Sequence, residues 1–160
     1  MRLLRGRGRV VALEPSSENI DILSKNLAQF PQVEVLQGAV GRRAGTGQFA
    51  DPHANYDAFQ VVETKAASDA TAFQIFSLEE LRNKDTFDFV KCDIEGTEWD
   101  IFRSPDGSVS SFILSTNLFA IEVHEAPEGC HLEEFRETFL SCKMTEFMSG
   151  EDTCFVRRVN

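Results

Sequence analysis

The sequence has 160 residues, of which 42% are hydrophobic and 26% are charged, a composition typical of one folded domain with a hydrophobic core. The 26 acidic and 16 basic residues give a formal net charge of −10, so most of the surface repels phosphate groups and we expect no nucleic-acid partner. No apolar stretch approaches the roughly 18 residues that a membrane helix needs, and the basic start "MRLLRGRGR" precedes too short an apolar segment for a signal peptide. We therefore predict a soluble, cytoplasmic, single domain over residues 1–160.

Strand-like and helix-like segments alternate along the chain, which predicts an α/β fold with a mostly parallel sheet and helical crossovers. We expect strands near residues 9–13, 33–37, 48–50, 72–76, 87–93 and 117–125, followed by a hairpin formed by "KMTEFM" and "TCFVRRV". We expect helices after Ser16, after Ser77, over residues 95–103 and over residues 131–142. Residues 107–114 fit either a helix or a strand. Residues 51–71 are polar and small, which indicates an excursion loop.

Hydrophobic spacing predicts which helical residues enter the core. In the C-terminal helix we expect Leu132, Phe135, Phe139 and Leu140 to face the sheet. Trp99 lies at helical spacing from Phe102, so packing in the core is a better interpretation than a stacking platform for a ligand.

The four cysteines are widely spaced and include no C-x-x-C pair. This pattern predicts neither a disulfide framework nor a zinc site. We expect buried, reduced thiols, as in a cytosolic protein.

Acidic residues follow the predicted strands at the sheet edge where open α/β proteins bind ligands. Glu14 ends the first strand, where one carboxylate can accept hydrogen bonds from two ribose hydroxyls. Alternatively, Glu14 lies there because negative charge is favourable beside the start of the next helix.

A second group of carboxylates follows the buried stretch "FDFVKC". Asp93 ends this strand and is expected to orient a cationic cofactor group or an acceptor hydroxyl. Glu95 and Glu98 fall in the first turn of the next helix, where the helix dipole explains their charge, and Asp100 is expected to be solvated.

A third strand end carries Glu122, His124 and Glu125. A histidine flanked by carboxylates at this edge is a candidate general base, although a structural histidine is the alternative. Asp93, Glu122 and His124 can form a metal site only if the fold brings all three together, and we predict no metal.

Taken in order, four segments resemble the FkbM-type methyltransferases, a branch of the S-adenosylmethionine-dependent class I (Rossmann-like) enzymes. They are "VVALEPSSENIDILSKNL", "VEVLQGAVGRRAGTGQFA", "SLEEL" before "FDFVKCDIEGTEWDIF", and "AIEVHE". The pattern K-x-D-I-E-G-x-E is the most specific of these. The resemblance implies O-methylation of a hydroxyl on a sugar or small natural product, with S-adenosylmethionine as cofactor and a small-molecule hydroxyl compound as partner.

The resemblance also implies roles for particular residues. Glu14 would hold the cofactor's ribose, and Asp93 would lie near its methionine end and the acceptor. The turn formed by Gln37, Gly38, Ala39 and Val40 would border the adenine. His124 or Asp93 would be the catalytic base, and Glu95, Glu122 and His124 would contact the substrate.

The chain departs from the family pattern at its start. Family members begin with a strand and a glycine-rich loop, D-x-G-A-N-x-G, that holds the methionine part of the cofactor, whereas residues 1–8 resemble only the end of the following helix. We therefore expect an N-terminally incomplete Rossmann-like domain, a gap between the strands at 9–13 and 87–92, and weak or no cofactor binding and activity by this chain alone.

Two other functions are compatible with parts of the pattern. A non-catalytic methyltransferase-like remnant that serves as an interaction module would fit the absent glycine loop. A nicotinamide-dependent oxidoreductase would use Glu14 in the same way, but the catalytic Tyr and Lys pair of such enzymes is not evident.

Overall fold

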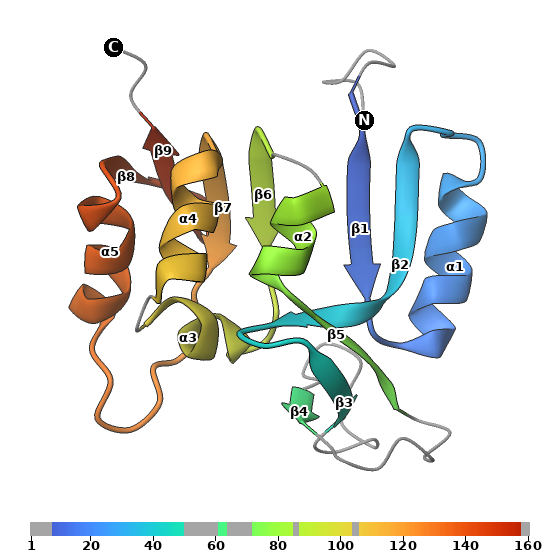
Figure 1. The fold of residues 1–160 in the computed structure, drawn as a ribbon, viewed down its shortest axis with the longest axis horizontal. Coiled ribbons are helices and arrows are strands. Elements are labelled where there is room, and N and C mark those ends of the chain that lie inside the picture. Colours follow the sequence, from blue (N-terminus) through green and yellow to red (C-terminus); the bar gives the residue numbers. More distant parts are fainter. Residues whose placement is uncertain (1–7, 50–60, 64–71, 85–86, 104–105, 158–160) are drawn as a thin grey trace.

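The computed structural model describes residues 8–49, 61–63, 72–84, 87–103 and 106–157, and within them the chain forms nine strands and five helices (Figure 1). The strands are β1 (Val10–Glu14), β2 (Val33–Gly41), β3 (Gly45–Phe49), β4 (Val61–Glu63), β5 (Phe73–Ser77), β6 (Phe89–Cys92), β7 (Leu118–Glu122), β8 (Met144–Ser149) and β9 (Asp152–Arg157). The helices are α1 (Ser17–Leu27), α2 (Leu78–Lys84), α3 (Thr97–Phe102), α4 (Gly107–Ser115) and α5 (Leu132–Ser141).

The described strands form two sheets, with the orders β1-β2-β5-β3-β4 and β6-β7-β9-β8. The pairs β1/β2, β2/β5 and β6/β7 are parallel, while β3 and the C-terminal hairpin contribute antiparallel pairs. The predicted α/β class and C-terminal hairpin are confirmed, but these strands form two mixed sheets instead of one mostly parallel sheet. Strands β1 and β6 each lie at the end of their sheet (Figure 1).

Strand β2 continues through the segment that was expected to form a turn. Its first five residues pair with β1, and the residues from Gly38 to Gly41 then pair with β5. A Cβ atom on Gly38 would lie 2.5 Å from the carbonyl oxygen of Gln74, so only glycine allows this close approach. The prediction of a turn at Gln37–Val40 is therefore wrong, because Gly38 lets the strand change partners without ending.

Side chains cap two helices as the sequence predicts. The Ser16 Oγ accepts a hydrogen bond from the Asn19 amide at 3.3 Å at the start of α1. At α2, Ser77 and Glu80 form a reciprocal capping box, with the Ser77 amide 2.9 Å from Glu80 Oε2 and the Glu80 amide 3.2 Å from Ser77 Oγ. These local interactions fix where α1 and α2 begin.

The core lies mainly between the helices and the second sheet, where aromatic rings pack against one another. Phe135 and Phe139 of α5 are fully buried, as predicted, and the Phe139 ring stacks on Phe155 of β9 with centroids 4.1 Å apart. Trp99 is also in this core, 2% exposed. Leu132 is partly buried, but Leu140 is 42% exposed, so its predicted core position is wrong. It follows Phe139 by one residue, which turns its side chain about 100° away from the core face.

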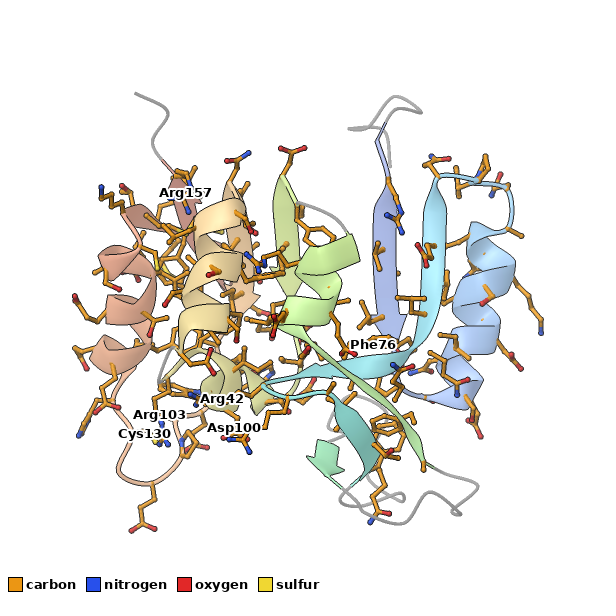
Figure 2. All side chains as sticks on the ribbon, in the orientation of Figure 1. Arg42, Phe76, Asp100, Arg103, Cys130 and Arg157 are labelled. Atoms are coloured by element: carbon orange, nitrogen blue, oxygen red, sulfur yellow. The ribbon has the colours of Figure 1, made fainter. Side chains whose placement is uncertain are left out.

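The segment that fitted either a helix or a strand is the helix α4. Asp106 caps it by accepting hydrogen bonds from the amides of Ser108 and Val109. At the C-terminal end of α4, Arg157 of β9 donates hydrogen bonds to the carbonyl groups of Ile113 and Thr116 (Figure 2). A guanidinium group is favourable at a helix C-terminus because it satisfies the last carbonyl groups there.

All four cysteines are free and buried, as expected. Burial, followed by the charge of Glu98, raises the pKa of Cys92 to about 12, so this residue stays a neutral thiol.

Strand β4 lies inside the range predicted as a polar excursion, and the other residues of 51–71 are outside the described part of the chain. None of the described helices has the length and apolar character that spanning a membrane requires.

We expect Phe139→Ala to lower the free energy of unfolding by about 3–5 kcal/mol, because it removes a fully buried ring that contacts several others. Urea unfolding followed by circular dichroism measures this loss. Phe147→Ala is the matched control: its side chain is 45% exposed, and we expect a change within about 1 kcal/mol. Equal losses in the two variants would contradict the position of the core.

Candidate active site at the carboxyl ends of the strands

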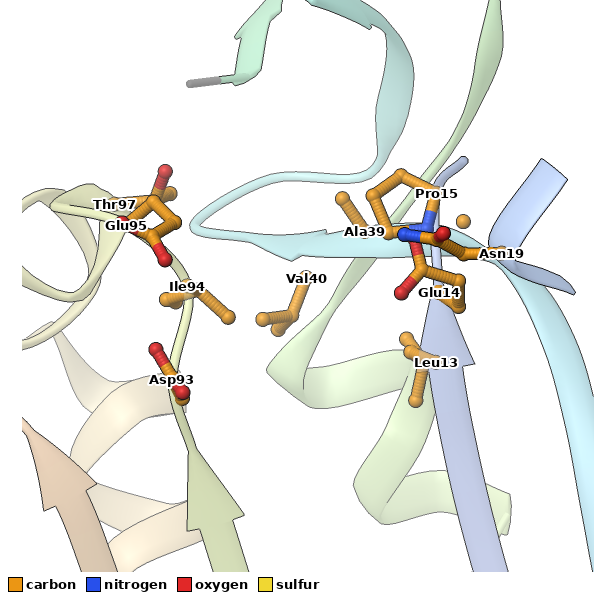
Figure 3. Close-up of a pocket in the computed structure, with 11 residues that line it drawn as sticks. Leu13, Glu14, Pro15, Asn19, Ala39, Val40, Asp93, Ile94, Glu95 and Thr97 are labelled. Atoms are coloured by element: carbon orange, nitrogen blue, oxygen red, sulfur yellow. The ribbon is translucent and has the colours of Figure 1, made fainter. Parts of the chain in front are cut away.

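A pocket lies at the edge of the two sheets where β1 and β6 end. Its volume is about 250 Å³, and it is lined by Leu13, Glu14, Pro15, Asn19, Gly38, Ala39, Val40, Asp93, Ile94, Glu95 and Thr97. Figure 3 shows Glu14 and Asp93 on opposite sides of this pocket, with Val40 between them. The pocket therefore combines apolar walls with carboxylates contributed by both sheets.

The structure brings together most of the residues that were predicted to bind a cofactor. Among the pocket residues are Glu14, Asp93 and the run from Gly38 to Val40. Gln37 is exposed and is not among the lining residues.

The Glu14 carboxylate already has one local hydrogen bond. Its Oε1 accepts from the Ser16 amide at 2.8 Å, which agrees with the interpretation that Glu14 stabilises the start of α1. A carboxylate has two oxygens and about four lone-pair positions, so this bond is compatible with binding of a ligand hydroxyl by Oε2.

The turn between β6 and α3 has two consecutive residues in the left-handed region, Glu95 with φ 53° and Gly96 with φ 94°. This conformation is uncommon for a residue with a side chain and favourable for glycine. The helix begins at Thr97 rather than at Glu95 as predicted, because the turn occupies the two preceding residues. The turn directs Glu95 toward His124 instead of along the helix.

Glu98 differs most from its sequence-based interpretation. It is in the first turn of α3, as predicted, but its side chain is 0% exposed. Its Oε1 accepts hydrogen bonds from the backbone amide of His124 at 2.8 Å and from His124 Nδ1 at 2.9 Å, while Oε2 accepts from the Gly96 amide at 2.9 Å. A helix dipole accounts for an exposed carboxylate, whereas a buried one needs specific partners of this kind.

His124 is held at three points. Besides the two bonds to Glu98, its carbonyl oxygen accepts a hydrogen bond from Trp99 Nε1 at 3.0 Å. An ionised carboxylate can only accept, so the proton of a neutral His124 is placed on Nδ1. The other nitrogen, Nε2, then faces Glu95 Oε2 at 3.3 Å and Asp93 Oδ1 at 3.9 Å.

This environment changes the proton affinity of His124. Partial burial lowers its pKa, but the hydrogen bond and charge of Glu98, together with the charges of Glu95 and Asp93, outweigh burial and raise the pKa above its ordinary value. The site therefore favours a positive charge at the imidazole.

Glu122 joins the same group from β7. Single ligand atoms of Asp93, Glu122 and His124 all lie within 4.8 Å of one another. Of the predicted site residues, Gln37, Glu122 and His124 are outside the pocket lining, while Asp93 belongs to both the pocket and this group. Sequence reasoning missed Glu98 as a site residue, although its position in "DIEGTEWD" before the buried Trp99 was a usable signal.

These features define an α/β protein with a pocket at the carboxyl ends of its strands, where ligands bind in open α/β folds, and a buried carboxylate that orients a histidine beside it. The family model described as "Methyltransferase FkbM domain" matches residues 1–145, and the chain belongs to this family. No curated protein and no solved structure matched the chain.

Glu98→Gln is expected to lower the free energy of unfolding by about 3 kcal/mol, because an amide cannot replace a buried carboxylate that accepts from three donors. Asp100→Asn is the matched control, since Asp100 is in the first turn of the same helix but is exposed, and we expect a change within about 0.5 kcal/mol. Urea denaturation of both variants provides the comparison. A Glu98→Gln protein as stable as Asp100→Asn would show that the buried carboxylate is unimportant for folding.

Proposed function

We propose that this protein is an S-adenosylmethionine-dependent methyltransferase that methylates a hydroxyl group of a sugar or small natural product. The observation that carries the proposal is the placement of Glu14 and Asp93 around one pocket, with His124 beside Asp93, in a chain of the FkbM methyltransferase family. The free, buried cysteines agree with a cytoplasmic enzyme, which is part of the proposal.

The pocket residues suggest how the cofactor would be held. Glu14 would accept hydrogen bonds from the ribose hydroxyls, the backbone and small side chains from Gly38 to Val40 would border the adenine, and Asp93 would face the methionine end. When bound, S-adenosylmethionine supplies the methyl group as a sulfonium. The Rossmann-like arrangement that this implies would place β1 and β6, the end strands of the two sheets, on either side of the cofactor site.

His124 and Asp93 are suited to prepare the acceptor. Methyl transfer to oxygen requires an aligned hydroxyl group and removal of its proton. The surrounding carboxylates favour the protonated imidazole, so His124 would act as a base after losing its Nε2 proton, with Nδ1 still hydrogen-bonded to Glu98. Its Nε2 would then accept the proton of an acceptor hydroxyl placed beside Asp93 and Glu95. Glu95 and Glu122 would then contact the substrate.

Isothermal titration calorimetry with S-adenosylmethionine tests the cofactor role. We expect weak binding, because about 250 Å³ is below the roughly 300–1,000 Å³ of typical ligand pockets. Glu14→Gln should weaken binding by about 10-fold through the loss of charged hydrogen bonds. Asp21→Asn, an exposed substitution on α1, should leave the affinity unchanged. Equal affinities for both variants and the wild type would remove Glu14 from the cofactor site.

The reaction itself is tested with cofactor carrying a deuterium-labelled methyl group and a panel of monosaccharides, glycosides and hydroxylated natural products. Mass spectrometry should detect a labelled O-methyl product. Asp93→Asn and His124→Asn should each reduce the rate by roughly 10²-fold to 10⁴-fold, the usual contribution of a positioned acid or base. Wild-type rates in both variants would exclude them from catalysis, and no transfer to any acceptor would favour the non-catalytic alternative.

A further inference from the structure

The strand register brings three potential metal ligands to one end of the second sheet. Cys92, the last residue of β6, pairs with Ile121 of β7, and Glu122 is the last residue of β7. Asp93 and His124 lie just beyond the ends of these two parallel strands, so all three residues are at the same end. One ligand atom from each of the three residues lies within 4.8 Å of the others.

The nitrogen ligand of this group is already oriented. Glu98 is fully buried and bonds to Nδ1 of His124, which leaves Nε2 directed toward Asp93 at 3.9 Å. Histidines that bind metals generally donate their other ring N–H to a carboxylate or carbonyl group in this way. The geometry is therefore that of a ligand and its supporting carboxylate, built from two different elements of the fold.

The two carboxylate ligands have contacts that are longer than hydrogen bonds. Asp93 Oδ1 is 3.9 Å from His124 Nε2, and Glu122 Oε2 is 3.8 Å from Lys91 Nζ, while Lys91 forms its short contact, 2.6 Å, with Asp152. Glu95 adds a further negative charge 3.3 Å from Nε2. Four carboxylates thus surround one imidazole, which favours an additional positive charge among them.

We propose that Asp93, Glu122 and His124 bind a divalent transition-metal cation through one nitrogen and two carboxylate oxygens. Such ligands lie about 2.0–2.2 Å from an ion, so their atoms need to approach to about 3–3.5 Å from one another. The Asp93 and Glu122 side chains are 44% and 34% exposed and have room to rotate inward. The imidazole suits Zn²⁺ and the two carboxylates suit Mn²⁺, whereas Mg²⁺ and Ca²⁺ prefer oxygen ligands alone.

This cation site would deepen the proposed methyl transfer, on which its catalytic use depends. An ion beside the pocket would lower the pKa of a coordinated acceptor hydroxyl and so help it to lose its proton. Without an ion, removal of that proton is the task of His124 as a base. Binding of the ion itself does not require cofactor or acceptor. If the protein binds no metal, the metal site is wrong but the methyltransferase proposal still stands. If the protein transfers no methyl group, the metal site is still tested by its measured affinity.

The test uses wild-type protein that has been treated with a chelator. It is titrated with Mn²⁺, with the free ion measured by electron paramagnetic resonance, and separately with Zn²⁺, with binding measured by calorimetry. We expect one equivalent of each ion to bind. Glu122→Gln and Asp93→Asn, which preserve side-chain size, should weaken binding strongly, and Glu98→Gln should weaken it by roughly 10-fold to 100-fold, as supporting residues do.

Glu125→Gln is the matched control, because it removes the same charge from an exposed position next to His124 and should bind Mn²⁺ like the wild type. Mn²⁺ should also selectively broaden the imidazole NMR signals of His124 in the wild-type protein, with the exposed His131 as internal reference. This measurement needs no variant and so does not depend on whether the substituted proteins fold. No binding, equal affinity in Glu122→Gln and Glu125→Gln, or equal broadening of His124 and His131 would overturn the proposal.

Discussion

The hydrogen bonds between Glu98 and His124 are the interaction on which the site depends. Glu98 enters from the first turn of α3, and His124 follows the end of β7, so these bonds connect two elements 26 residues apart in the sequence. They hold both the backbone amide and the ring of His124 against the Glu98 side chain. Without them, neither the direction of Nε2 nor its distance from Asp93 would be defined.

Burial makes this interaction strong and also costly to disturb. A carboxylate removed from water loses its hydration, which specific hydrogen bonds must offset. Glu98 obtains them from two amides and an imidazole, and the neighbouring Trp99 anchors the His124 carbonyl while packing its ring against Phe135 of the core. The polar site is thus attached to the aromatic core through consecutive residues of one short helix.

Asp93 is the point at which the pocket and the histidine cluster meet. It lines the pocket opposite Glu14 (Figure 3), and its carboxylate is also grouped with His124 and Glu122. In the proposed enzyme, Asp93 would therefore couple cofactor binding to the chemistry of the acceptor or the cation. The left-handed turn at Glu95 and Gly96 makes this possible, because it lets the chain leave β6, expose Asp93 at the sheet edge and still bury Glu98.

The sequence alone determined the features that depend on near neighbours: the helix caps at Ser16 and Ser77, the core positions of Phe135 and Phe139 in α5, the C-terminal hairpin, and the acidic residues at the strand ends. Only the tertiary structure decided the features that depend on distant partners. Gly38 continues a strand because β5 passes beside it, and Glu98 is buried because His124 supplies donors there. Asp93, Glu122 and His124 meet because β6 and β7 pair in one register. Local patterns report conformational preferences over a few residues, whereas burial and register arise from contacts between segments far apart in the chain.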